Sequence, residues 1–179
     1  MKLQKTNIVL FLSVLIGLTF TSCDESDYYT YTRRATLDIN PDTCTSDRYD
    51  GSFSFFYDVF DTDISDVNLN REELIRSRLN RSELWVEGRN IYPNDKLWLS
   101  FEADGRIYAV TLAAQTDSNG SFMYIDERDP QYAAFMARLI DRVIQYRSVR
   151  LYVEGKFEAN AEITFKMTIK NDIEVDLRN

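Results

Sequence analysis

An acidic loop in the first half of the chain carries the side chains that could bind a metal ion. Asp61, Asp63, Ser65 and Glu72 place oxygen atoms at positions one, three, five and twelve, which is the spacing of an EF-hand calcium loop. The match fails at Asp66, which stands where such a loop needs glycine for its sharp turn. We therefore expect a solvated acidic loop, with calcium as the less favoured alternative, and predict no bound cofactor.

Histidine is absent from all 179 residues, which removes the usual general base near neutral pH and the commonest zinc ligand. No Ser-His or Cys-His nucleophile can therefore form. The 29 acidic residues leave paired carboxylates as the available catalysts, and glycoside hydrolysis would need two of them about 5–10 Å apart in a cleft. Because six glycines leave little room for cleft-forming loops, we predict that the protein is not an enzyme, with a carboxylate-dependent glycoside hydrolase as the less favoured alternative.

Three aromatic residues stand at positions that predict an outward-facing group. Trp85 alternates with Leu84 and Val86, Trp98 lies between Leu97 and Leu99, and Tyr152 has the same parity in a later strand-like segment. If these strands share a sheet, the three rings would form a platform for a sugar or a protein partner. The alternative is that a helix covers this face of the sheet and that the rings belong to the core.

The N-terminus has the three-part layout of an export signal. Lys2 and Lys5 precede an apolar run from Ile8 to Phe20, and the small residues Thr21-Ser22 follow it directly before Cys23. The run is shorter than the roughly 20 apolar residues that a membrane-spanning helix needs. We therefore expect residues 1–22 to be removed as a signal peptide.

Phe20-Thr21-Ser22-Cys23 resembles the lipobox of bacterial lipoproteins, although phenylalanine stands where leucine is usual. The resemblance implies that Cys23 becomes the new N-terminus and carries diacylglycerol and palmitate. At roughly 0.8 kcal/mol per buried methylene, two or three acyl chains form a permanent anchor. The next residues, Asp24-Glu25-Ser26-Asp27, resemble the acidic tag of surface-displayed lipoproteins of Bacteroides-type bacteria; a solvated acidic stem is the equally weighted alternative.

Composition sets the size and the class of the mature chain. Removing the signal leaves 157 residues, enough for one hydrophobic core. The formal net charge of −8 becomes more negative once the two signal lysines are lost, which argues against nucleic acid as a partner. With Cys23 carrying lipid, Cys44 has no partner for an internal disulfide. We expect an acidic and aromatic stem over residues 23–34 and a single β-rich domain over residues 35–179.

Period-two alternation predicts strands around Leu37 and Ile39 and from Phe53 to Val59, the latter central because it is apolar on most of both faces. Asp104-Gly105 predicts a two-residue hairpin turn that pairs Ala103 with Arg106. Asn119-Gly120 predicts a turn or a longer loop before a strand at 122–125.

Two helices are expected. Asp129 as N-cap and Pro130 at the first position open a segment with apolar residues at helical spacing up to Ile144. A shorter helix is predicted from Arg71 to Leu79, where Asn70 and Glu73 have the spacing of a capping pair. Each predicted helix leads into a similar strand, 84–88 and 151–155, which indicates either an internal repeat or a chance match.

These elements predict a mainly β fold, a β-sandwich-like domain with two helices; the alternative is an α+β open sheet with both helices on one face. Together with the anchor, this order of helices followed by strands resembles the uncharacterised small single-domain surface lipoproteins of Bacteroides-type bacteria. The resemblance implies an outer membrane lipoprotein at the cell surface, or otherwise facing the periplasm. The function expected is a non-catalytic module that binds a glycan or an envelope protein; the alternative is a structural subunit of an outer-membrane complex.

Overall fold

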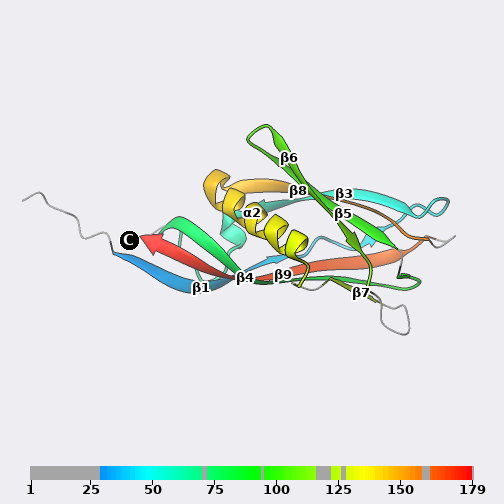
Figure 1. Ribbon diagram of the computed structural model, residues 1–179, viewed down its shortest axis with the longest axis horizontal. Coiled ribbons are helices and arrows are strands. Elements are labelled where there is room, and N and C mark those ends of the chain that lie inside the picture. Colours follow the sequence, from blue (N-terminus) through cyan, green and yellow to red (C-terminus); the bar gives the residue numbers. More distant parts are fainter. Residues whose placement is uncertain are drawn as a thin grey trace, which may run out of the picture.

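The computed structural model describes residues 29–178, except 70–71, 94, 116–121, 126–127 and 159–161. Cys23, the acidic tag after it and the Asn119-Gly120 turn lie outside the described residues. In the part described, two antiparallel sheets and one α-helix, α2 (Pro130–Tyr146), build the fold (Figure 1). The prediction of a β-sandwich-like fold is confirmed.

The sheets contain five and four strands. The order in the five-stranded sheet is β1-β9-β4-β7, with the short β2 paired to β9 as well. The order in the four-stranded sheet is β3-β8-β5-β6. The strands of the first sheet are β1 (Thr30–Ile39), β2 (Cys44–Thr45), β4 (Glu73–Gly88), β7 (Phe122–Ile125) and β9 (Thr164–Arg178). Those of the second are β3 (Ser52–Phe60), β5 (Lys96–Ala103), β6 (Arg106–Ala113) and β8 (Ser148–Lys156).

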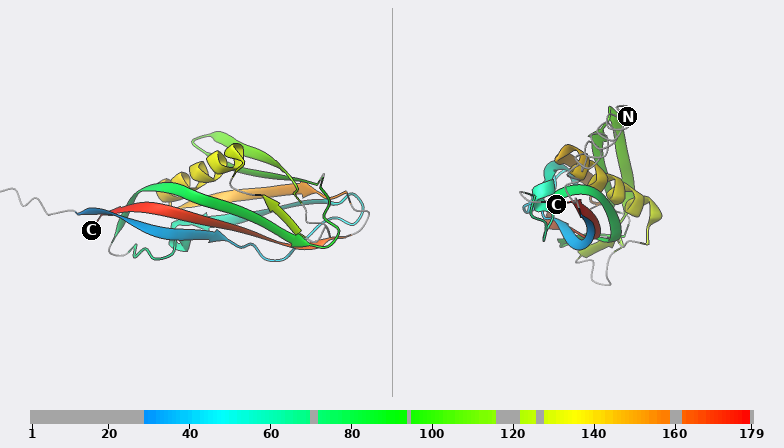
Figure 2. Two further views of the ribbon diagram at one scale, coloured as in Figure 1. Left: turned by 60° about the horizontal axis from the view of Figure 1, so that its bottom comes forward. Right: turned by 90° about the vertical axis from the view of Figure 1, so that its left-hand side faces the viewer.

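One core lies between the sheets, built by the alternate residues of each strand that point inward. In β9 every second residue from Phe165 to Leu177 is buried, and β8 buries Val149, Leu151 and Val153 in the same way. The helix packs against β4 of one sheet and against β8 and β6 of the other (Figure 2). Its apolar stripe therefore belongs to the same core as both sheets.

The two elements with strong local signals form as predicted. The Asp129 side chain accepts hydrogen bonds from the N–H groups of Gln131 and Tyr132, and the helix begins at Pro130. Ala103 pairs with Arg106 across the Asp104-Gly105 turn, where both turn residues have positive φ. The hairpin register is thereby fixed, and the side containing Leu97 and Leu99 is buried, as the alternation predicted.

The helix predicted over Arg71 to Leu79 is wrong, because residues from Glu73 onward belong to the sixteen-residue strand β4. This strand pairs with β9 and carries two register shifts, between Leu74 and Arg76 and between Leu79 and Arg81. Each bulge moves the inward face by one residue. The apolar positions 74, 75 and 79 therefore mimic helical spacing. The repeat consequently fails at its first step, since only 151–155 follows a helix.

Two further expectations are corrected. Strand β1 begins at Thr30 and pairs with β9 from its first residue, so residues 30–34, expected in the stem, are part of the sheet. Strand β3, expected at the centre of a sheet, pairs with β8 alone among the described strands and forms an edge. Phe56 and Phe60 make it apolar on its outer face as well, yet both side chains are exposed.

Candidate functional site

The structure brings together two of the three aromatic residues singled out in the sequence. Trp98 on β5 and Tyr152 on β8 lie on the outer face of the four-stranded sheet, in neighbouring strands. Trp98 is opposite Glu154 and Tyr152 is opposite Ser100, so the two rings are diagonal neighbours. Trp85 belongs to β4 in the other sheet, where its indole N–H donates to Glu83 Oε2 at 3.4 Å. The three-ring platform therefore does not form.

A different residue, Phe56 of β3, extends the pair to three rings. Phe56 is directly opposite Tyr152, with their ring centroids 6.5 Å apart and their planes at 58°. The residues are 56% (Phe56), 41% (Tyr152) and 37% (Trp98) exposed. We call Phe56, Tyr152 and Trp98 the aromatic face. The helix that could have covered it packs on the inward side, against the core residues of β8.

A charged pair lies beside the aromatic face. Arg150 of β8 donates to both carboxylate oxygens of Asp58 on β3, from Nε at 2.7 Å and from Nη2 at 3.0 Å. The same guanidinium lies 4.3 Å from the centroid of the Phe56 ring. This bidentate pairing holds the pKa of Asp58 below its usual range. Arg150 is thus fixed between a carboxylate and a ring, with half of its side chain still exposed.

A groove of 490 Å³ opens next to this pair, where β5 and β8 separate beyond Ser100. Its wall on one side is the β5–β6 turn, which is tied to the end of α2. Asp104 accepts a hydrogen bond from the Tyr146 hydroxyl and forms an ion pair with Arg142 at 2.9 Å. The bond to Asp104 raises the pKa of Tyr146. The groove is lined by Asp58, Glu102, Ala103, Asp104, Gly105, Ser148, Arg150 and Tyr152.

The four residues of the calcium pattern each make other contacts. Asp61 is buried and forms an ion pair with Arg147 at 2.8 Å, while Asp63 accepts from the N–H of Phe60. The Ser65 hydroxyl accepts from the N–H of Thr36 in β1.

Glu72 accepts from the Tyr31 hydroxyl and from the N–H of Asn68, and both bonds lower its pKa. Among the described residues, no group of three acidic or thiol side chains is placed to hold a metal ion.

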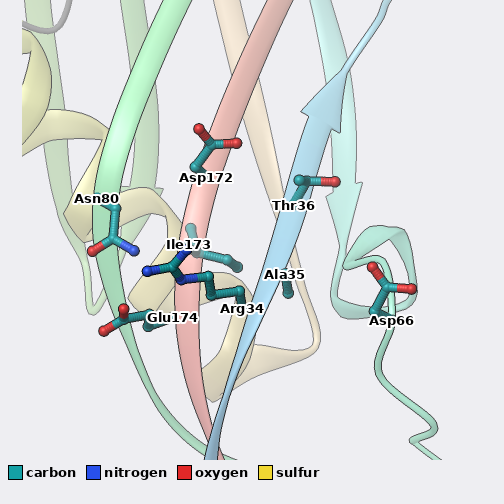
Figure 3. A pocket seen from close by; sticks show the side chains of 8 residues that line it. All are labelled: Arg34, Ala35, Thr36, Asp66, Asn80, Asp172, Ile173 and Glu174. Atoms are coloured by element: carbon teal, nitrogen blue, oxygen red, sulfur yellow. The ribbon is translucent and has the colours of Figure 1, made fainter.

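A second hollow, of 610 Å³, lies on the outer face of the five-stranded sheet (Figure 3). Arg34 of β1 extends over β9 toward Glu174 and Asn80, and Asp172 is the next outward residue of β9. Asp66 stands apart, beyond β1. The apolar residues that line the hollow, Ala35 and Ile173, are both buried. None of the side chains that line this hollow is aromatic, whereas the groove beside Asp58 and Arg150 adjoins three exposed rings, so the aromatic face is the stronger candidate.

Sequence reasoning found Trp98 and Tyr152 because strand alternation alone gives their facing. It missed Phe56, Asp58 and Arg150, because their grouping depends on β3 pairing with β8, 92 residues apart in the chain for Asp58 and Arg150. The available signal was an aromatic residue, Phe56, on the polar side of an otherwise alternating strand. Cys23 lies outside the described residues, and Cys44 is half-buried, which raises the pKa of its thiol.

Within the described residues no helix is long and apolar enough to cross a membrane. No family model and no curated protein matches the chain. Among solved structures, one from Desmodium yellow mottle tymovirus is 10% identical over 83% of this chain and 88% of that chain, with a TM-score of 0.41.

The BFDV capsid protein is also similar. Its decameric form is 9% identical over 82% of this chain and 99% of that chain, with a TM-score of 0.39. Its 60-mer form is 7% identical over 83% and 94%, with a TM-score of 0.37. All three TM-scores are below 0.5, so these similarities carry no inference about function.

Proposed function

We propose that this chain is an outer membrane lipoprotein, anchored through Cys23, whose four-stranded sheet binds a glycan without turning it over. The observation that carries the proposal is the aromatic face, three exposed rings from three adjacent strands, with the Asp58–Arg150 pair beside it. The anchor is inferred from the lipobox-like segment, which lies outside the described residues.

A sugar ring matches this surface in two ways. Its C–H faces are apolar and flat, so they can stack on Phe56, Tyr152 and Trp98 and remove apolar area from water. Its hydroxyl groups need donors and acceptors, and the groove supplies Arg150 as donor and Glu102 as acceptor. Because the rings stand on paired strands, little conformational entropy is lost when they bind.

The proposal of binding without catalysis is supported by the surroundings of Asp58, one of the carboxylates at the groove. A glycoside hydrolase needs a carboxylic acid whose pKa is raised, so that it can protonate the leaving oxygen. Asp58 has the opposite environment, since Arg150 lowers its pKa and occupies both of its oxygens. A carboxylate held in this way stays ionised and cannot serve as the protonated acid that cleavage of a glycosidic bond needs.

The first test compares the two tryptophans, which provide a matched pair in different sheets. Trp98→Ala should weaken retention on glycans by a factor of about two to ten, because losing one stacked ring costs about 0.5–1.5 kcal/mol. Trp85→Ala should leave retention unchanged. Glycan affinity electrophoresis measures both effects, with melting temperatures as a check on folding. Equal loss in the two variants, or no retention by the wild type, would contradict the proposal. If the wild type retains no glycan and an envelope protein co-purifies with it, the chain would instead be a structural subunit of an outer-membrane complex.

The second test concerns the anchor and the location. Cys23→Ala should abolish incorporation of labelled palmitate and release the protein from the membrane pellet, because the acylated thiol is lost. Protease added to intact cells should digest the wild-type domain if it is displayed at the surface. Equal labelling of Cys23→Ala would refute lipidation at this residue, and protection of the wild type from protease would place the domain in the periplasm.

A further inference from the structure

The outer edge of β3 is a surface to which the proposed glycan site assigns no role. The strand runs for nine residues without a register shift and pairs with β8 on one side only, among the described strands. It contains no proline and no lysine, which are common protections of an exposed edge. A long, regular and partly aromatic edge of this kind is a template for another strand.

The backbone hydrogen bonds at the two ends of β3 show which of its residues point their N–H and C=O groups away from β8. The N–H of Phe157 donates to Gly51 O, and the N–H of Asp61 donates to Arg147 O, in the same register as the strand pair. In an antiparallel pair, hydrogen-bonded residues alternate with residues whose N–H and C=O point to the other side. The odd-numbered residues of β3 therefore bond to β8, and the even-numbered ones face the free edge.

The chain itself closes both ends of this edge and leaves the middle open. The N–H of Ser52 donates to Asp50 Oδ1, and its C=O accepts from the N–H of Asp47. The N–H of Phe60 donates to Asp63 Oδ2. Between them, Ser54, Phe56 and Asp58 present their N–H and C=O groups outward, and no described residue bonds to these groups.

We propose that two copies of this chain pair along β3, antiparallel about Phe56, so that their four-stranded sheets form one continuous sheet. In this register Phe56 is opposite the partner's Phe56, and Ser54 is opposite the partner's Asp58. Ser54, Phe56 and Asp58 are the three residues whose outward backbone groups bond to no described residue. This is the one two-fold register in which each of the three faces another of the three on the partner copy. The closed residues Ser52 and Phe60 then also face each other.

The charges agree with this register. Asp58 meets a serine, and its carboxylate is already neutralised by Arg150 of its own chain. A two-fold axis centred on Asp58 would instead place two carboxylates opposite each other, which is destabilising. The pairing also joins the two aromatic faces across Phe56, which would give a glycan two adjoining platforms.

Disulfide trapping in intact cells tests the register, with all variants in the full chain carrying Cys44→Ser. Phe56→Cys should give a cross-linked dimer on oxidation, because opposite residues of a hydrogen-bonded pair have Cα atoms about 5.5 Å apart, within disulfide range. Ser54→Cys is the matched control. Its position and the partner's Ser54 are offset by four residues, on the order of 14 Å, so no disulfide should form.

A proline separates edge pairing from random collision. Adding Ser54→Pro to Phe56→Cys should abolish the dimer band, because it removes an N–H that bonds only across the new interface. Adding Ser54→Thr, which keeps that N–H, should preserve the band. Proline is tolerated at a free edge, and an unchanged melting temperature would verify folding. A Phe56→Cys chain that stays monomeric, cross-links to a different protein, or gives no more dimer than Ser54→Cys would overturn the proposal.

Discussion

A buried polar network links three elements through single side-chain atoms. Ser82 Oγ on β4 lies 2.9 Å from the Tyr132 hydroxyl of α2 and 2.7 Å from Asn171 Oδ1 of β9. The Asn171 amide nitrogen donates to the C=O of Leu37 on β1 at 2.7 Å. A serine has one proton, so Ser82 donates to the carbonyl oxygen of Asn171 and accepts from Tyr132. Every member of the network is fully buried or nearly so.

Removing the central hydroxyl should therefore be costly. Ser82→Ala leaves Asn171 Oδ1 and the Tyr132 hydroxyl without this partner in a site closed to water, so we expect the free energy of unfolding to fall by about 1–3 kcal/mol. Ser54→Ala makes the same chemical change at an exposed strand position and should stay within about 0.5 kcal/mol. Urea unfolding of both variants measures the difference. Similar small effects in both would mean that the network adds no net stability.

At the residue scale, regular alternation predicts which face of a strand a side chain occupies. It does not predict which residues of other strands lie beside that side chain. Alternation placed Trp98 and Tyr152 on an outer face. It also placed Trp85 on an outer face, and nothing local indicates that β4 enters the other sheet. Serine at 82 and asparagine at 171 carry no sequence signal of burial, because polar residues inside a strand usually face solvent.

At the element scale, prediction succeeded where the determining contacts are close in sequence. The Asp129 side chain bonds to residues two and three positions on, and the Asp104-Gly105 turn pairs Ala103 with Arg106, three positions apart. The prediction for the start of β4 was wrong because β9 imposes the strand conformation there, and the paired residues of β9 are some 80 to 100 positions away. Pairing on that scale sets the two bulges, and the bulges remove the period of two from the sequence.

The prediction of β3 as a central strand was wrong for the same reason, because strand order depends on pairing between residues far apart in the sequence. An apolar outer face usually indicates a strand covered on both sides. In β3 the outer aromatic residue, Phe56, is instead exposed beside Tyr152 and under the Arg150 guanidinium. The pattern that misled the prediction of a central strand is therefore the signal of the candidate site, and strand order was needed to separate the two meanings.

At the scale of the whole molecule, the two sheets and α2 share one core, so they should fold as a unit. The helix lies against β4 of one sheet and against β8 and β6 of the other. Its central residue Leu139 is fully buried. The sandwich therefore has no interface along which one sheet could separate without exposing the helix stripe to water.

The two tryptophans make this cooperativity measurable, because each reports on one sheet. Trp98→Phe leaves Trp85 in the five-stranded sheet as the fluorescent probe, and Trp85→Phe leaves Trp98 in the four-stranded sheet. Each probe should give the same urea midpoint as circular dichroism recorded on the same variant, as expected for two-state unfolding. Adding Leu139→Ala should lower the stability of both variants by a similar 2–5 kcal/mol, because the cavity lies between the sheets. A tryptophan midpoint that differs from the dichroism midpoint of its own variant, or a loss confined to one variant, would show that the sheets unfold independently.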